Sequence, residues 1–189
     1  MTYRRGFKTE AEVTAQEVRR ELDLGGMDPL DPRVLAEHLA IPVLSLSDLE
    51  LASEGSAGYF LDTEPKTFSA VTVFRGLHRT IVHNDAHAPV RQHSNLAHEL
   101  AHGLLGHAPT PALDDRGCRL WNQNVEDEAA FLGGALLLPR DACIATALRG
   151  DGVSDIARHF EISEEMVRYR LGVSGARTIA TRSRLRRRK

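Results

Sequence analysis

The chain of 189 residues has only two cysteines and no long apolar run. Cys118 and Cys143 cannot make the disulfide framework of a small secreted domain, and they suit a reducing compartment. The longest apolar stretch, around residues 133–138, is far shorter than the roughly 20 residues that cross a bilayer. The opening MTYRRGFKTEAEV has arginines but no apolar core after them, unlike a signal peptide. We therefore expect a cytoplasmic protein that does not bind membranes.

Charge is unevenly spread along the chain, although the formal net charge is only -2. Seven of the 24 basic residues lie from Arg177 onward with no acid among them, which leaves 17 basic against 26 acidic residues before that point. An acidic body is unlike the basic surface of a DNA-binding domain. We expect residues 176–189 to form a basic, disordered tail. Nucleic acid or an acidic partner could contact this tail, but a solubilising role explains it equally well.

Apolar residues at helical spacing predict two helices near the N-terminus. The first spans residues 9–24, and the second follows Asp31, which is a good N-cap with Pro32 at the first helical position. The apolar residues expected to face the core are Val13, Val18, Leu22, Val34, Leu35 and Leu39.

A β-region is predicted next. Residues 69–74 (SAVTVF) and 80–83 (TIVH) read as a hairpin or as neighbouring strands, and the turn-rich residues 53–62 are expected to lead into a strand. Helices are then predicted from Pro89 to about residue 103 or 106, over residues 124–138, and over a short stretch from Pro139. Two short helices with a turn at residues 161–163 complete the pattern.

The helix that begins at Pro89 carries HSNLAHELAHGLLGH, with four histidines around one acid. Residues four apart share a helix face, so His98 and His102 would present their imidazoles to one ion. Glu99 lies one step round the helix, where it can take a proton from water. This HExxH arrangement is typical of zinc peptidases, in which zinc lowers the pKa of water toward ~7 and glutamate acts as general base. The alternative is a helix with two surface histidines.

A catalytic zinc needs a third protein ligand and one open position. His107 lies five residues past His102, one short of the metzincin spacing, and Cys118 would make a less usual catalytic set. Glu126 and Glu128 begin an otherwise apolar helix, and a buried carboxylate needs a partner such as zinc. Glu128 shares its face with apolar residues and is the preferred ligand, with Glu126 as the alternative. The preference of acids for a helix N-terminus could also explain both.

Four blocks in this order resemble the ImmA/IrrE-type zinc metallopeptidases over residues 10–173. The blocks are DPRVLAEHLAIPV, RTIVHNDAHAPVRQHSNLAHELAHGLLGH, VEDEAAFLGGALLLP and VSDIARHFEISEEMVRYRLGV. The resemblance implies that His98, His102 and Glu128 are zinc ligands and that Glu99 is the general base. The sequence departs from the family pattern at packing positions, namely Ser94, Leu132, Gly133 and Leu138.

The resemblance also implies a function. Members of the family cleave a helix-turn-helix repressor, often encoded beside them, so we expect a zinc-dependent endopeptidase that acts on such a repressor in stress or mobile-element regulation. One alternative is a DNA-binding regulator, although Glu164 and Glu165 at the start of the candidate recognition helix would repel phosphates. Another is a zinc-dependent regulatory module without peptidase activity, in which Glu99 would have no role. Manganese also suits two histidines and a carboxylate.

These observations predict an α+β fold in which a small mixed sheet packs on a helical core that carries the HExxH helix, as in zincins. The expected divisions are a zincin-like metallopeptidase domain at residues 1–150, a small helix-turn-helix-like segment at residues 151–175, and the tail at residues 176–189. The active site is expected in the groove between the sheet edge and the HExxH helix, where an extended substrate can add to the edge.

Overall fold

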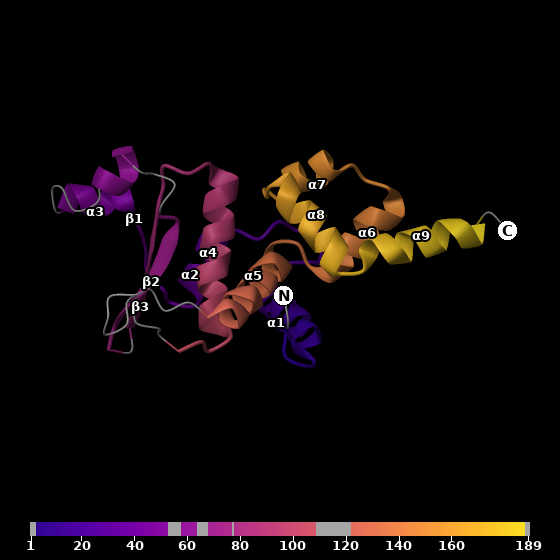
Figure 1. Ribbon diagram of the computed structural model, residues 1–189, viewed down its shortest axis with the longest axis horizontal. Helices are drawn as coiled ribbons and strands as arrows, with labels where there is room; N and C mark the ends of the chain where they lie inside the picture. The colour runs from indigo at the N-terminus through magenta and orange to yellow at the C-terminus, as the bar shows by residue number, and fades with distance from the viewer. Residues whose placement is uncertain (1–2, 53–57, 64–67, 77, 109–121, 188–189) are drawn as a thin grey trace.

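A computed structural model describes residues 3–52, 58–63, 68–76, 78–108 and 122–187 (Figure 1). Its strands are β1 (Val43–Ser45), β2 (Ala70–Arg75) and β3 (His78–His83). Its helices are α1 (Phe7–Glu21), α2 (Pro32–His38), α3 (Leu46–Ala52), the π-helix η1 (Tyr59–Thr63), α4 (Pro89–Leu104), α5 (Gln123–Leu137), α6 (Arg140–Arg149), α7 (Val153–His159), α8 (Glu164–Val173) and α9 (Ala176–Arg187). Over these residues the fold is α+β, as the sequence predicts.

The strands of the described residues form one mixed sheet in the order β1-β3-β2. β2 and β3 pair antiparallel, with Val71 opposite Val82, which confirms the predicted hairpin, and β1 pairs parallel to β3. β2 is therefore an edge strand. Its side chains alternate, with Val71 and Val73 exposed while Thr72 between them is partly covered. The sheet lies against α4, which positions Thr72 next to that helix (Figure 1).

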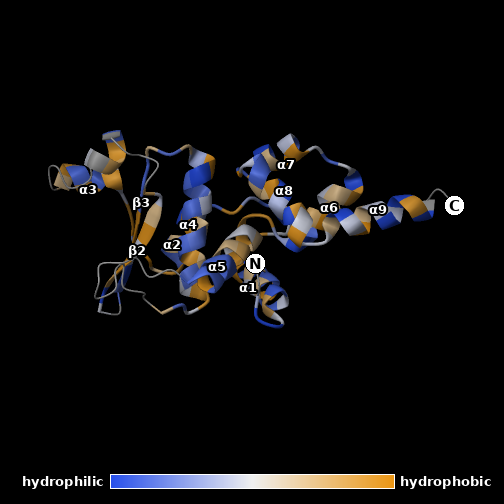
Figure 2. Ribbon diagram, viewed as in Figure 1, coloured by the Kyte–Doolittle hydropathy of each residue, from blue (hydrophilic) through white to orange (hydrophobic). Residues whose placement is uncertain are grey.

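The core lies where α1 and α4 pack on α5. Pro89 opens α4, as expected, and this helix buries one face. α5 begins with polar residues and continues with apolar ones that are almost all buried (Figure 2). The buried side chains at this junction include Phe7, Ala11, Ala15, Val18, Leu96, Leu100, Ala129, Leu132 and Leu136.

Among the described helices, none is long and apolar enough to cross a membrane alone. Only the pair of α5 and α6, which is bent by 58°, reaches the required length and composition.

Gly133 allows α5 to approach α4 closely. A Cβ atom at this position would lie 3.1 Å from the backbone carbon and oxygen of Ala97 and 3.2 Å from the backbone nitrogen of His98. Backbone atoms of a buried helix cannot move aside as the end of a flexible side chain can. The glycine therefore sets the spacing between the two helices next to a candidate metal ligand.

We predict that Gly133→Ala lowers the free energy of unfolding by about 1–3 kcal/mol, because the added methyl group overpacks this contact. Gly172→Ala is the matched control, since nothing lies within 4 Å of a Cβ atom added there. That change should be neutral or raise stability by up to about 1 kcal/mol, because alanine favours the helix. Urea unfolding of both variants measures the difference, and equal stabilities would contradict the close-approach interpretation.

The C-terminal helices are tied to the body by a buried ion pair. Ser163 caps α8 by accepting a hydrogen bond from the backbone nitrogen of Met166, as the sequence predicts. Arg170 in α8 is fully buried, lies 2.6 Å from the Glu12 carboxylate of α1, and donates to the backbone oxygen of Leu138. Breaking such a pair would leave a buried charge without its partner. The divisions at residues 150 and 175 remain predictions.

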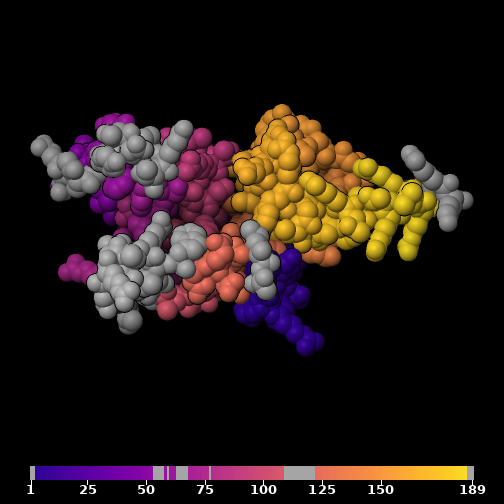
Figure 3. Space-filling view, viewed as in Figure 1, coloured from indigo at the N-terminus to yellow at the C-terminus, as the bar shows by residue number. Residues whose placement is uncertain are grey.

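The expected disordered tail is instead largely helical. Ala176–Arg187 form α9, which extends away from the body (Figures 1 and 3). Ala176 and Ala180, four residues apart on one face, are buried, and α9 contacts α6 and α8. The high charge of this segment predicts disorder. The helix forms because Ala176 and Ala180, two small apolar residues at helical spacing, pack against the neighbouring helices. The last two residues lie outside the described ones.

One other expectation needs correction. The apolar spacing predicts that Val13 and Val34 face the core, but they are 46% and 52% exposed. Val18 and Leu35 on the same helices are buried, as predicted, and so is Phe7, which the predicted set does not include.

At the end of the turn-rich stretch, Tyr59–Thr63 make a single π-helical turn. Residues 64–67 after it lie outside the described residues, and the next described strand is β2. Residues 53–57 of that stretch lie outside the described residues.

Candidate metal centre

His98 and His102 meet on the face of α4 that turns toward the start of α5. Their Nε2 atoms are 3.1 Å apart, and their ring centroids are separated by 4.8 Å. Both side chains are partly buried. The opposite face of the helix packs in the core through Leu96 and Leu100, which holds the backbone of both histidines in place. The predicted convergence of the two imidazoles is thus present in the structure.

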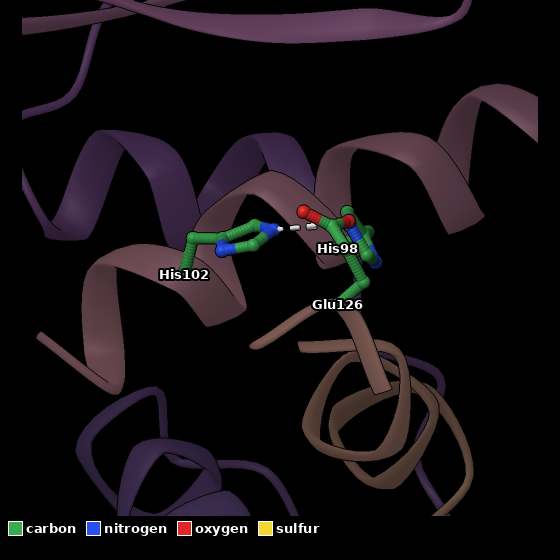
Figure 4. Close-up of side chains that lie close together, drawn as sticks. All are labelled: His98, His102 and Glu126. Carbon is green, nitrogen blue, oxygen red and sulfur yellow. Dashed lines mark hydrogen bonds and ion pairs between the residues drawn. The ribbon is translucent and has the colours of Figure 1, made fainter. Parts of the chain in front are cut away.

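Glu126 completes a cluster of three donor atoms (Figure 4). Its Oε2 atom lies 3.1 Å from His98 Nε2 and 3.7 Å from His102 Nε2. The residue is in the first turn of α5, where Asn122 caps the helix by accepting from two backbone nitrogens. The neighbouring imidazoles of His102 and His98 hold the pKa of Glu126 far below its usual range. The carboxylate is therefore in the ionised form that binds a cation.

The spacing of the cluster fits a small divalent ion. Zinc bonds of 2.0–2.2 Å in tetrahedral geometry place neighbouring donor atoms about 3.3 Å apart. The three distances among His98, His102 and Glu126, from 3.1 to 3.7 Å, lie on both sides of that value. Two imidazole nitrogens and one carboxylate oxygen are donors that zinc commonly takes. The residues present thus fit the metal that the sequence predicts, and they also suit manganese.

Glu128, which the sequence favours as third ligand, lies elsewhere. One of its oxygens is 3.6 Å from His107 Nε2, and the other is 3.5 Å from Arg4 Nε. Two residues along an α-helix are about 200° apart around its axis, so Glu126 and Glu128 cannot both face the same histidines. The structure brings Glu126, and not Glu128, to His98 and His102. The ligand role of each glutamate remains a prediction.

His107, another candidate ligand, is also outside the cluster. His107 places its Nδ1 atom 2.9 Å from Nδ1 of His102, on the side of that ring away from Glu126. Burial, together with the charge of His102, lowers the pKa of His107. Cys118 lies outside the described residues.

Glu99, the predicted general base, contacts the sheet. Its Oε2 atom accepts a hydrogen bond of 2.6 Å from the Thr72 hydroxyl of the edge strand β2. Glu99 follows His98 directly on α4, so the carboxylate lies between the metal-binding face of the helix and the strand. Sequence reasoning missed Thr72, because nothing in a strand pattern marks one threonine as the partner of an acid 27 residues away.

An α+β fold with a His-His-Glu cluster is compatible with a zincin-like metal site. A family model described as the IrrE N-terminal-like domain, peptidase M78, matches residues 36–172. This match covers most of the chain, and the chain belongs to that family, which confirms the resemblance seen in its motifs. No curated protein matches it. Family membership supports a metallopeptidase-type function with a protein substrate.

Proposed function

We propose that the protein is a zinc-dependent endopeptidase in which His98, His102 and Glu126 hold the metal and Glu99 is the general base. The observation that carries the proposal is the convergence of three donor atoms within 4.8 Å of one another. Glu99 lies next to one of these ligands in the sequence. A structural zinc site would use four protein ligands and would not need this acid.

A zinc ion held by these residues would lower the pKa of a water molecule and polarise the carbonyl of the scissile peptide. Glu99 accepts the proton of the attacking water and passes it to the departing amine. Thr72 orients the carboxylate through the hydrogen bond to Oε2. Because a hydroxyl that donates to a charged group forms a strong hydrogen bond, Thr72 limits the rotation of the base.

The edge strand β2 offers a place for the substrate. β2 pairs only with β3 among the described strands, and its Val71 and Val73 side chains are exposed. An extended peptide can add to such an edge through main-chain hydrogen bonds. Thr72 in the same strand contacts Glu99, so a peptide bound along β2 would pass close to the base.

We further propose that the substrate is a helix-turn-helix repressor encoded nearby and that cleavage occurs in the cytoplasm, in stress or mobile-element regulation. This proposal rests on the family resemblance. The DNA-binding alternative has weaker support. In α8, which would be its recognition helix, Arg170 is fully buried, and Arg168 is paired with Glu164. Neither arginine is arranged to contact phosphates or bases.

The test is to incubate the repressor encoded nearest to the gene with the zinc-loaded protein, with the chelator-treated protein, and with the treated protein after zinc is restored. Fragment masses identify any cleaved bond. The proposal predicts one set of fragments that disappears with the metal and returns with zinc. Cleavage that persists in the metal-free protein and in His98→Ala would contradict a metal-dependent mechanism.

Thr72→Val should lower kcat by about 10–100-fold. Valine has nearly the shape of threonine but cannot donate to Glu99, and a hydrogen bond to a charged group contributes about 1.5–3 kcal/mol. Zinc affinity should stay unchanged, because Thr72 is not in the donor cluster. Thr72→Ser keeps the hydroxyl and is the control. Equal kcat values for the valine and serine variants would show that the hydrogen bond does not position the base.

A further inference from the structure

We infer that His107 and Glu128 form a chain of contacts that orients His102 for metal binding. The inference rests on the proposed metal site and assigns a role to two residues outside it. The chain runs from His102 Nδ1 to His107 Nδ1 over 2.9 Å, and from His107 Nε2 to a Glu128 oxygen over 3.6 Å. The His107 and Glu128 side chains are only 12% and 15% exposed, so water competes weakly for these contacts.

The two ends of this chain of contacts, the metal at His102 and the carboxylate of Glu128, determine which ring nitrogen of each histidine carries a proton. A ring nitrogen that binds a metal carries no proton, so a neutral His102 that binds through Nε2 carries its proton on Nδ1. That N–H can donate to His107 Nδ1, which must then be an acceptor. His107 therefore carries its proton on Nε2, the atom that faces the Glu128 carboxylate. The metal at one end and the carboxylate at the other favour the same pair of tautomers.

Glu128 has further contacts that keep it at the end of this chain. Its second oxygen lies 3.5 Å from Arg4 Nε, and Arg4 also pairs with Glu10 at 2.6 Å. The N-terminal segment thus places a cation beside the carboxylate. This arrangement gives different roles to two of the acids at the start of α5. Glu126 would bind the metal directly, and Glu128 would act through His107.

Loss of this chain should weaken metal binding. Outer partners of ligating histidines fix the ring orientation and increase the basicity of the ligand, and their removal typically costs 10–100-fold in metal affinity. Without His107, the Nδ1–H group of His102 loses its acceptor. The imidazole can then rotate or place its proton on Nε2, the atom needed for the metal. His107 and Glu128 are therefore positioning residues.

The experiment compares the zinc dissociation constants of the wild type and four variants of the protein. Each constant is measured by competition with a chromogenic chelator. His107→Ala should bind zinc about 10–100-fold more weakly than the wild type. His107→Asn should recover most of this loss, because the asparagine carbonyl can accept from His102. Glu128→Gln should cause a smaller loss. His38→Ala is the matched control, since it removes an exposed histidine that is paired with Glu21 at 3.0 Å.

A second readout follows the geometry of the metal centre. With cobalt(II) in place of zinc and all sites filled, His107→Ala should shift the visible absorption bands, and His107→Asn should restore them. Unchanged affinity and bands in His107→Ala would overturn the inference. Equal losses in the alanine and asparagine variants would also overturn it, because they would indicate packing instead of hydrogen bonding. Should His107→Ala fail to fold, as judged by circular dichroism, Glu128→Gln and His107→Asn give the answer.

His98→Ala separates this inference from the proposed function. If His98→Ala no longer binds zinc while His107→Ala binds it normally, the metal site stands and the positioning role is wrong. If His98→Ala binds zinc as tightly as the wild type, the proposed metal site itself is wrong.

Discussion

Glu99→Gln should reduce kcat by about 10²–10⁴-fold, the range expected when a general base is removed. Glutamine has nearly the same size and can still accept the hydrogen bond from Thr72, but it cannot take a proton from water. The zinc dissociation constant should stay within a few-fold of the wild-type value, because Glu99 is outside the donor cluster. Cleavage rates at saturating substrate and metal content measured on the same samples provide the comparison.

The control for this substitution is Glu165→Gln, which makes the same chemical change at an exposed position in α8. It should leave both kcat and metal content unchanged. If Glu99→Gln keeps more than about a tenth of the wild-type rate, another group takes the proton, and the role assigned to Glu99 is wrong.

Glu126→Ala should weaken zinc binding by more than about 100-fold, which exceeds the loss typical of an outer partner. The variant loses a charged ligand that lies 3.1 Å from His98 Nε2. Zinc should also stop raising the melting temperature, since stabilisation by a ligand follows the logarithm of its concentration over the dissociation constant. At a free zinc concentration of about 100 times the dissociation constant, the free energy of unfolding of the wild type should rise by about 2.7 kcal/mol.

The zinc affinity of Glu126→Ala should be compared with that of Glu128→Ala, which removes an acid two residues away on the same helix. Glu128→Ala should weaken binding by no more than about 100-fold. A larger loss in Glu128→Ala than in Glu126→Ala would reverse the assignment and restore the ligand that sequence reasoning favoured.

The features that could be predicted from the sequence are local. His98 and His102 share a face because they are one helical turn apart, whatever packs around them. The β2–β3 hairpin follows from two adjacent strand patterns with a short connection, and its turn includes Gly76 at a positive φ of 62°. Asp31 and Ser163 cap their helices through bonds to backbone atoms two or three residues away. Each of these features depends on residues that are no more than one helical turn apart or on two strands that follow each other directly in the chain.

The features that could not be predicted depend on how elements cross. The choice between Glu126 and Glu128 is set by the rotation of α5 against α4, and hydrophobic periodicity identified the face toward the core but not the face toward the histidines. Val13 and Val34 fit an apolar stripe, yet no element covers them within the described residues. Thr72 meets Glu99 only because the edge of the sheet lies beside α4.

Zinc-edge anomalous diffraction from crystals grown with zinc tests the metal centre most directly. We predict a peak 2.0–2.2 Å from Nε2 of His98, Nε2 of His102 and a carboxylate oxygen of Glu126. No protein atom other than these three should bind the ion, which leaves one position open for water or substrate. The absence of a peak between α4 and α5, or a peak ligated by Glu128 in place of Glu126, would contradict this centre.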